Sequence, residues 1–266
     1  MEFQTKSDLA YERIRQAILD GSIPIGAKLT VTNLVDQYGM SPMPIREALT
    51  KLAQDGLVQS TPHHGARVAE FNYYDHLESS LIRSALEKQL FQAALQFWDD
   101  IRLDALEECY NQLYTLLDQG NISEFSRLRR NFFQIIYRVV PLDGLKQLVE
   151  NYNNRYQIFH YFVVKIAEED GLDRTWELLS ELKSLLHALQ NRKFEVCTAL
   201  FNQILLNDYL VFSRYLMNSL DKEELLGDSE YDFLWSHEKL TPEKRSEIRK
   251  NIEMFIKLRM NNISAN

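Results

Sequence analysis

Apolar residues recur at the spacing of an α-helix face through nearly the whole stretch from Tyr73 to Leu220. Short polar breaks divide the stretch into expected helices, which span residues 73–97, 101–118, 122–139, 143–168, 172–190 and 194–220. Neither the alternating pattern of strands nor a tandem repeat occurs there. Because five of the six prolines and most of the glycines precede residue 145, little interrupts these helices. Such helices bury their apolar faces against one another, which predicts an antiparallel helical bundle.

The first 70 residues carry a shorter and more broken pattern. We expect Asp8 to cap a first helix and Gly21 to close it. The apolar residues of that helix recur at helical spacing, at Ala10, Ile14, Ala17 and Ile18. A turn-rich connection, "SIPIGAKL", leads to a short second helix of about residues 31–38, which ends at Gly39.

A third helix follows within "GMSPMPIREALTKLAQDGL". Ser41 is a natural cap, Pro42 suits the first helical position, Pro44 still lies in the first turn, and Gly56 ends the helix. The two prolines stiffen the start of the helix rather than break it. Helical spacing turns one set of residues inward: Ile45, Ala48, Leu49 and Leu52. A second set falls on the opposite face: Met43, Arg46, Glu47 and Thr50.

The next segment, "LVQSTPHHGARVAEF", predicts two short strands joined by a turn. Three helices followed by a hairpin form the pattern of a winged helix-turn-helix domain, in which the third helix enters the DNA major groove by its N-terminal residues. Arg46 stands there and suits a guanine edge or a phosphate. His64 and Gly65, at the hairpin tip, offer a second contact. The alternative is that Arg46 only pairs with Glu47 or with solvent.

The residues "REAL", "GLV" and "HGARV", with their spacing across residues 9–70, resemble the N-terminal domain of the GntR family of bacterial transcription regulators. The resemblance implies DNA contacts at Thr32, Ser41, Met43, Arg46, His64 and Gly65. The chain departs from the family pattern in one place. Pro42 stands where the family usually has an arginine, and Met43 where a small hydroxyl residue is common. The departure implies a shifted operator sequence or a lower affinity.

The bundle resembles the all-helical effector domain (FCD type) of the FadR-like branch of that family, through "LIRSALEKQL" at residues 81–90. Many members of this branch hold a divalent metal with an aspartate, a histidine four residues later and two further histidines. Those positions fall here on Arg129 and Phe133, near Leu182 and near Ile204. Because none of these side chains suits a metal, we expect the fold without a metal or any other cofactor.

An arginine in place of the aspartate reverses the charge of that site. If Arg129 points inward it needs a counter-anion, because an unpaired buried charge is costly. The carboxylate of an effector, or an acyl-CoA type group, would supply one, with Arg83 as a second clamp and Phe133 beside it. Two alternatives remain open. Arg129 or Arg130 could face solvent, or the bundle could have lost ligand sensing and serve only dimerisation or protein docking.

Charge and motifs limit the other classes of function. The net charge is −8, and residues 1–70 hold seven Lys and Arg against eight Asp and Glu, so DNA binding must depend on where charge is placed. Phosphate-loop, nucleophile-elbow and HExxH motifs do not occur, so we do not expect an enzyme. The two cysteines, Cys109 and Cys197, sit among apolar neighbours and are expected to be buried thiols. Neither a signal peptide nor an apolar run of membrane-spanning length occurs, which predicts a cytoplasmic protein.

These patterns predict a division into a winged helix-turn-helix domain (1–71), a helical effector-binding and dimerisation domain (72–220) and a C-terminal extension (221–266). The extension contains an amphipathic helix that begins at Thr241 and Pro242. Its apolar stripe consists of Ile248, Ile252, Phe255 and Ile256. The helix could pack on the bundle, reach a partner subunit or contact DNA. The family implies a homodimer, because two-fold operators match paired recognition helices. The expected function is a DNA-binding repressor that a small metabolite controls.

Overall fold

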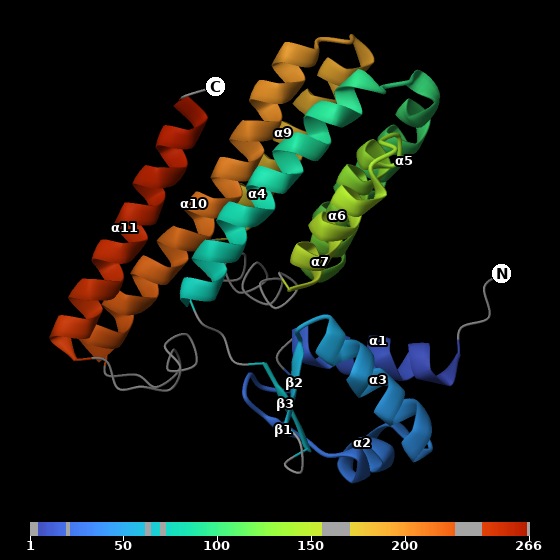
Figure 1. Cartoon of the computed structure of the whole chain (residues 1–266), viewed down its shortest axis with the longest axis vertical. Helices are drawn as coiled ribbons and strands as arrows, with labels where there is room; N and C mark the ends of the chain where they lie inside the picture. The colour runs from blue at the N-terminus through green and yellow to red at the C-terminus, as the bar shows by residue number, and fades with distance from the viewer. Residues whose placement is uncertain are drawn as a thin grey trace.

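The computed structural model describes residues 5–19, 22–61, 65–69, 73–155, 171–226 and 241–264. The chain forms a small N-terminal body of helices and strands and a larger bundle of long helices, as predicted (Figure 1). The N-terminal body contains α1 (Lys6–Leu19), β1 (Lys28–Leu29), α2 (Val31–Tyr38), α3 (Pro42–Gln54), β2 (Val58–Thr61) and β3 (Gly65–Val68). This order confirms the winged helix-turn-helix architecture.

Helix α1 begins three residues earlier than the sequence pattern indicates. The backbone N–H of Asp8 donates to Thr5 Oγ1 at 3.1 Å, and the N–H of Thr5 donates to Asp8 Oδ2 at 3.1 Å. Thr5 is therefore the cap and Asp8 the third helical residue of a capping box, which corrects the expected cap at Asp8. Lys51 Nζ also donates to Asp8 Oδ1 at 2.6 Å, and this ion pair connects α1 to α3. The expected end at Gly21 lies outside the described residues.

Helix α3 starts and ends where the sequence predicts. Ser41 is its N-cap and Pro42 its first residue. The inward set is 0–9% exposed: Ile45, Ala48, Leu49 and Leu52. The outward set is exposed: Met43, Arg46, Glu47 and Thr50. Gly56 takes a left-handed conformation (φ 76°), and the N–H of Leu57 returns to the carbonyl of Leu52 at 3.0 Å. The Ser41 side chain makes no capping hydrogen bond, so the local signals that mark this helix are Pro42 at its first position and Gly56 after its last turn.

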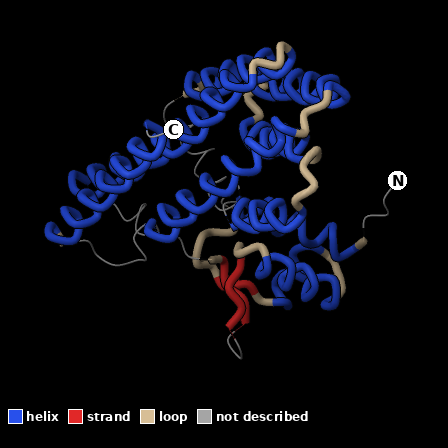
Figure 2. Tube along the Cα trace, turned by 45° about the horizontal axis from the view of Figure 1, so that its top comes forward, coloured by secondary structure: helices blue, strands red, loops and turns tan. Residues whose placement is uncertain are grey.

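The predicted hairpin is present, and a third strand extends it. Strands β2 and β3 are antiparallel, with Val58 opposite Val68 and Thr61 opposite Gly65. Strand β1 pairs with the other edge of β3, so the order is β1-β3-β2. Figure 2 shows the strands together at one side of the N-terminal body, beside its helices. The sequence did not predict β1, because two residues are too short for an alternating pattern.

The bundle contains α4 (Tyr73–Gln96), the short 3-10 helix η1 (Asp100–Arg102), α5 (Leu103–Asp118), α6 (Ile122–Tyr137), α7 (Asp143–Arg155), α9 (Asp173–Gln190), α10 (Phe194–Leu226) and α11 (Pro242–Ser264). Most bounds lie within two residues of the predicted ones. The expected helix 143–168 is described as far as Arg155, and the rest of it lies outside the described residues. Helix α10 continues six residues beyond Leu220.

Aromatic rings fill the centre of the bundle between α4, α6 and α10. The rings of Phe91 and Phe201 stack with centroids 4.1 Å apart, and both are at most 2% exposed. Cys109 and Cys197 are buried and unbridged, as expected, and burial raises the pKa of each thiol to about 11.

Helix α11 packs on its own chain, which is the first of its three expected alternatives. It runs beside α10 (Figure 1), with Ile248 and Ile252 at most 4% exposed. Phe255 and Ile256 are partly buried against the same cluster as Leu216 and Leu220 of α10. The apolar stripe read from the sequence is therefore the stripe that the helix buries.

Candidate functional site

The start of α3 presents its polar side chains to solvent. Met43 is 65% exposed, and Thr32, Ser41 and Arg46 are also exposed. Pro44 and Ile45 are buried behind them and hold the first turn against the domain core. Within the described part of the chain Arg46 makes no ion pair, so the alternative of an Arg46–Glu47 pair is not what the structure has. The guanidinium of Arg46 is therefore available for an external partner.

The wing brings two further basic residues together. Lys28 of β1 lies directly opposite Arg67 of β3, and both are exposed. Arg67 Nη1 donates to the carbonyl of Gly26 at 2.6 Å, which holds the side chain against the segment that precedes β1. The sequence pattern did not predict this pair, because it depends on the unpredicted strand β1. Gly65 begins β3, whereas His64, the other expected tip residue, lies outside the described residues.

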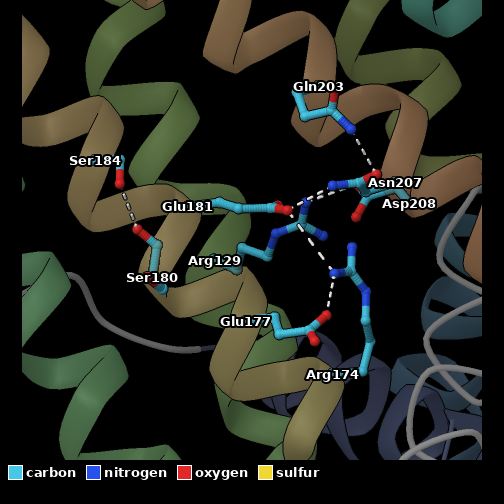
Figure 3. Close-up of polar contacts among 9 residues, drawn as sticks. All are labelled: Arg129, Arg174, Glu177, Ser180, Glu181, Ser184, Gln203, Asn207 and Asp208. Atoms are coloured by element: carbon cyan, nitrogen blue, oxygen red, sulfur yellow. Dashed lines mark hydrogen bonds and ion pairs between the residues drawn. The ribbon is translucent and has the colours of Figure 1, made fainter.

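Arg129, which the family resemblance places at a metal position, forms an ion pair in the structure. Arg129 Nη2 of α6 lies 2.6 Å from Asp208 Oδ2 of α10 (Figure 3). Arg83 Nη2 of α4 lies 3.9 Å from the same oxygen, and Arg83 Nε lies 3.4 Å from Glu87 Oε2. Two cations and two anions from three helices therefore form a partly buried network, and Arg129 receives its counter-anion from within the chain.

A second pair of charges borders this network on α9. Arg174 Nη1 lies 3.8 Å from Glu181 Oε1, and Asn207, next to Asp208, donates to the same oxygen (Figure 3). Burial raises the pKa of Glu181, and its Oε2 atom is buried with no hydrogen-bond partner among the described residues. The hydroxyl of Tyr137 on α6 is likewise buried without a partner in the described part. Glu181 Oε2 and the Tyr137 hydroxyl are therefore polar atoms in the centre of the bundle with which a bound molecule could form hydrogen bonds.

The side chains at the four expected metal positions do not fit a metal. Arg129 is a cation, and its guanidinium carbon lies 5.9 Å from the centroid of the Phe133 ring. Phe133 packs edge-on against Phe201 at 5.6 Å. Leu182 and Ile204 are at most 1% exposed in the apolar core. Because none of these groups donates an electron pair to a cation, the site cannot repeat the family's metal chemistry.

Sequence analysis identified Arg83, Arg129 and Phe133 but missed the acids that join them. Arg129 contacts both Asp208 and the Phe133 ring, and Arg83 reaches Asp208, so the structure brings the three residues to one place. Asp208 lies one helical turn after Ile204, the position expected for a histidine. The sequence did contain a signal for Asp208: it lies four residues after Ile204, and residues i and i+4 share a helix face, so Asp208 was a candidate to face the same site.

Comparison with known proteins defines the class of this chain. Residues 6–68 match the model of the bacterial regulatory proteins of the gntR family, and residues 78–207 match that of the FCD domain. The chain belongs to the GntR family of HTH-type transcription regulators, with an FCD domain that fits the FadR-like branch. Members of this class bind DNA and small-molecule effectors and typically form dimers; they are not enzymes.

Individual relatives agree with this class. The HTH-type regulator YdhC of Bacillus subtilis is 24% identical, over 70% of this chain and 81% of that protein. The HTH-type transcriptional repressor RspR of Escherichia coli is 26% identical, over 53% of this chain and 62% of that protein. The solved structure of E. coli McbR/YncC superposes with a TM-score of 0.66, at 23% identity, over 79% of this chain and 99% of that chain, which supports the fold. Among the described helices, none has the length and apolar character needed to cross a membrane.

Proposed function

We propose that this chain is a homodimeric transcriptional repressor of the cytoplasm that binds double-stranded DNA through the start of α3 and the wing. The single observation that carries the proposal is the exposed, proline-stiffened first turn of α3, on which Arg46 has no partner among the described residues. The proposed contacts are Thr32, Ser41, Met43, Arg46, His64 and Gly65. Lys28 and Arg67 join them as phosphate contacts of the wing. This arrangement gives an acidic chain a local basic surface.

The domains have separate roles in this proposal. Residues 1–71 read DNA, residues 72–220 bind the effector and form the dimer, and residues 221–266 support α10 through α11. Effector binding in the bundle favours one placement of the two DNA-reading domains. Operator affinity then changes by the difference in the effector's binding free energy between the two placements.

The DNA-binding half is tested by fluorescence anisotropy with DNA from upstream of the gene. We expect Arg46→Ala to weaken specific binding about tenfold or more, because one base-edge contact contributes about 1–3 kcal/mol. Arg138→Ala is the matched control, because Arg138 is an exposed arginine at the C-cap of α6 and is not part of the DNA-reading domain. Equal affinities for both variants would contradict the proposed role of Arg46.

We propose the centre of the bundle as the effector site, with Arg83, Arg129 and Phe133 as its contacts. A carboxylate or phosphate of the effector would compete with Asp208 for the Arg129 guanidinium. The buried Tyr137 hydroxyl would donate a further hydrogen bond to the anion, and Glu181 Oε2 would accept one from a donor group of the effector. In this case Arg129→Ala abolishes the response to the effector and leaves operator binding intact. Loss of operator binding in the absence of effector would contradict the assignment.

One observation favours a second function, in which the bundle serves only dimerisation or protein docking. Asp208 already neutralises Arg129 within the chain, so the centre does not require a ligand for charge balance. A thermal-stability screen with carboxylates and acyl-CoA compounds separates the two functions. A compound whose stabilisation disappears in Arg129→Ala supports sensing at the centre, and a screen without such a compound supports docking.

A further inference from the structure

A cavity of about 480 Å³ lies between the DNA-reading domain and the bundle. Helix α1 contributes Tyr11, Glu12 and Arg15 to its wall, and α6 contributes Arg127 and Arg130. Glu150 of α7 lies on the same wall. A hydrogen bond of 3.2 Å from Gln16 Nε2 to Ser123 Oγ joins α1 to α6. The volume is that of a pocket for a small metabolite, for which about 300–1,000 Å³ is typical.

Three guanidinium groups converge on this cavity, and two of them have acids nearby. Arg15 lies 3.7 Å from Glu12, and Arg127 pairs with Glu124. Arg130 makes no ion pair or hydrogen bond with any residue in the described ranges. Burial, with the positive charge of Arg15 as a smaller cause, lowers the pKa of Arg130 to about 10, against the weaker opposing effects of Tyr11 and Glu150. The cavity therefore contains a partly buried cation that forms no ion pair with any described residue.

Arg129 and Arg130 are neighbours in sequence but serve different places. Successive residues of an α-helix point about 100° apart, so the two side chains cannot share a partner on one face. Arg129 reaches Asp208 in the bundle centre, whereas Arg130 lines the cavity against α1. The cavity is therefore separate from the proposed effector site, and its walls belong to two domains.

An uncompensated guanidinium in a partly buried cavity favours an anion, because a bound carboxylate or phosphate replaces the lost hydration with charge-assisted hydrogen bonds. Two carboxylates on the wall, Glu12 and Glu150, limit the excess of positive charge. A ligand with two or more anionic groups, spaced to meet Arg130 and a second arginine, gains most from this arrangement.

We propose that the cavity between α1 and α6 is a second ligand site, which binds a small polyanionic metabolite, a polycarboxylate or a phosphate compound, through Arg130. Because the ligand contacts both domains, it holds the DNA-reading domain in one position against the bundle. The regulatory consequence rests on the proposed function as a DNA-binding regulator, but the binding itself does not.

The test measures the melting temperature of the full chain with citrate, inorganic phosphate and pyrophosphate, at constant ionic strength maintained with sodium chloride. At ten times its Kd, one of the three probes should raise the melting temperature by about 3–6 °C. The citrate arm and the phosphate arms distinguish the two sources of anionic groups. Arg130→Gln should lose this increase, and Arg130→Lys, which keeps the charge but not the forked donor, should retain part of it.

Arg138→Gln, on the same helix and exposed, is the matched control and should respond like the wild type. In chloride alone, Arg130→Gln should melt at or above the wild-type temperature, because the substitution removes a cation without a partner. An absent response to all three probes, or an equal response in Arg130→Gln, overturns the proposal. A response that disappears in Arg129→Gln but persists in Arg130→Gln also overturns it, and assigns the probe to the bundle centre instead. Operator binding by the wild type without any probe tests the proposed function separately.

Discussion

The replacement Asp208→Asn removes the anion of the ion pair between Arg129 and Asp208. Two unit charges about 4 Å apart attract by about 4 kcal/mol at an effective dielectric constant near 20. Arg129 is 19% and Asp208 24% exposed, so water screens part of this attraction. We expect the free energy of unfolding of the variant to fall by about 2–3 kcal/mol, because Arg129 stays partly buried without its anion. This loss is smaller than the roughly 3–5 kcal/mol for breaking a fully buried pair, because water screens the two charges.

The measurement is calorimetric or urea-induced unfolding of the full chain, in which this loss corresponds to a melting temperature lower by about 5–10 °C. Glu177→Gln is the control, because its pair with Arg174 has a similar N–O distance of 2.7 Å but Glu177 is 65% exposed. A surface pair of this kind contributes about 0–1 kcal/mol. The double variant Arg129→Gln/Asp208→Asn should recover part of the loss, since it also removes the orphaned cation. Equal losses in Asp208→Asn and Glu177→Gln would refute the argument from burial.

Two further predictions concern the ends of the chain. The hydrogen bond from Lys51, with those from Thr5, lowers the pKa of Asp8 to about 2 from its ordinary 3.8. Because the folded-state pKa is the lower one, the stabilisation is complete above pH 4 and is lost as the pH falls through 2. Acid unfolding of Asp8→Asn should therefore depend less on pH between 4 and 2 than that of the wild type, and identical curves would exclude the contacts of Asp8 with Lys51 and Thr5 as a source of that pH dependence. At the other end, Ile252 is 0% exposed, so Ile252→Ala should cost about 2–5 kcal/mol in urea unfolding. Met254→Ala, at a residue 49% exposed on the same helix, should cost far less, and equal losses would argue against the packing of α11.

The boundaries of most helices follow from local chemistry, and the sequence alone predicts them. Ser41 and Pro42 start α3, Asn121 caps α6 through the N–H of Glu124 at 3.2 Å, and Pro242 starts α11. Such signals act over three or four residues, so no distant contact is needed to read them. The inward stripe of α3 is equally local, because helical geometry decides which residues share a face.

The character of the two polar sites was decided only by the tertiary structure. The sequence places Arg129 and Arg130 on different faces of α6, but it does not state what either face meets. Packing brings Asp208 to Arg129 from 79 residues away, and brings Arg15 of α1 to the same cavity as Arg130. Strand β1 also depends on packing, because its two residues become a strand only beside β3. Charge compensation and edge pairing are interactions between distant segments, and no local pattern encodes their partners.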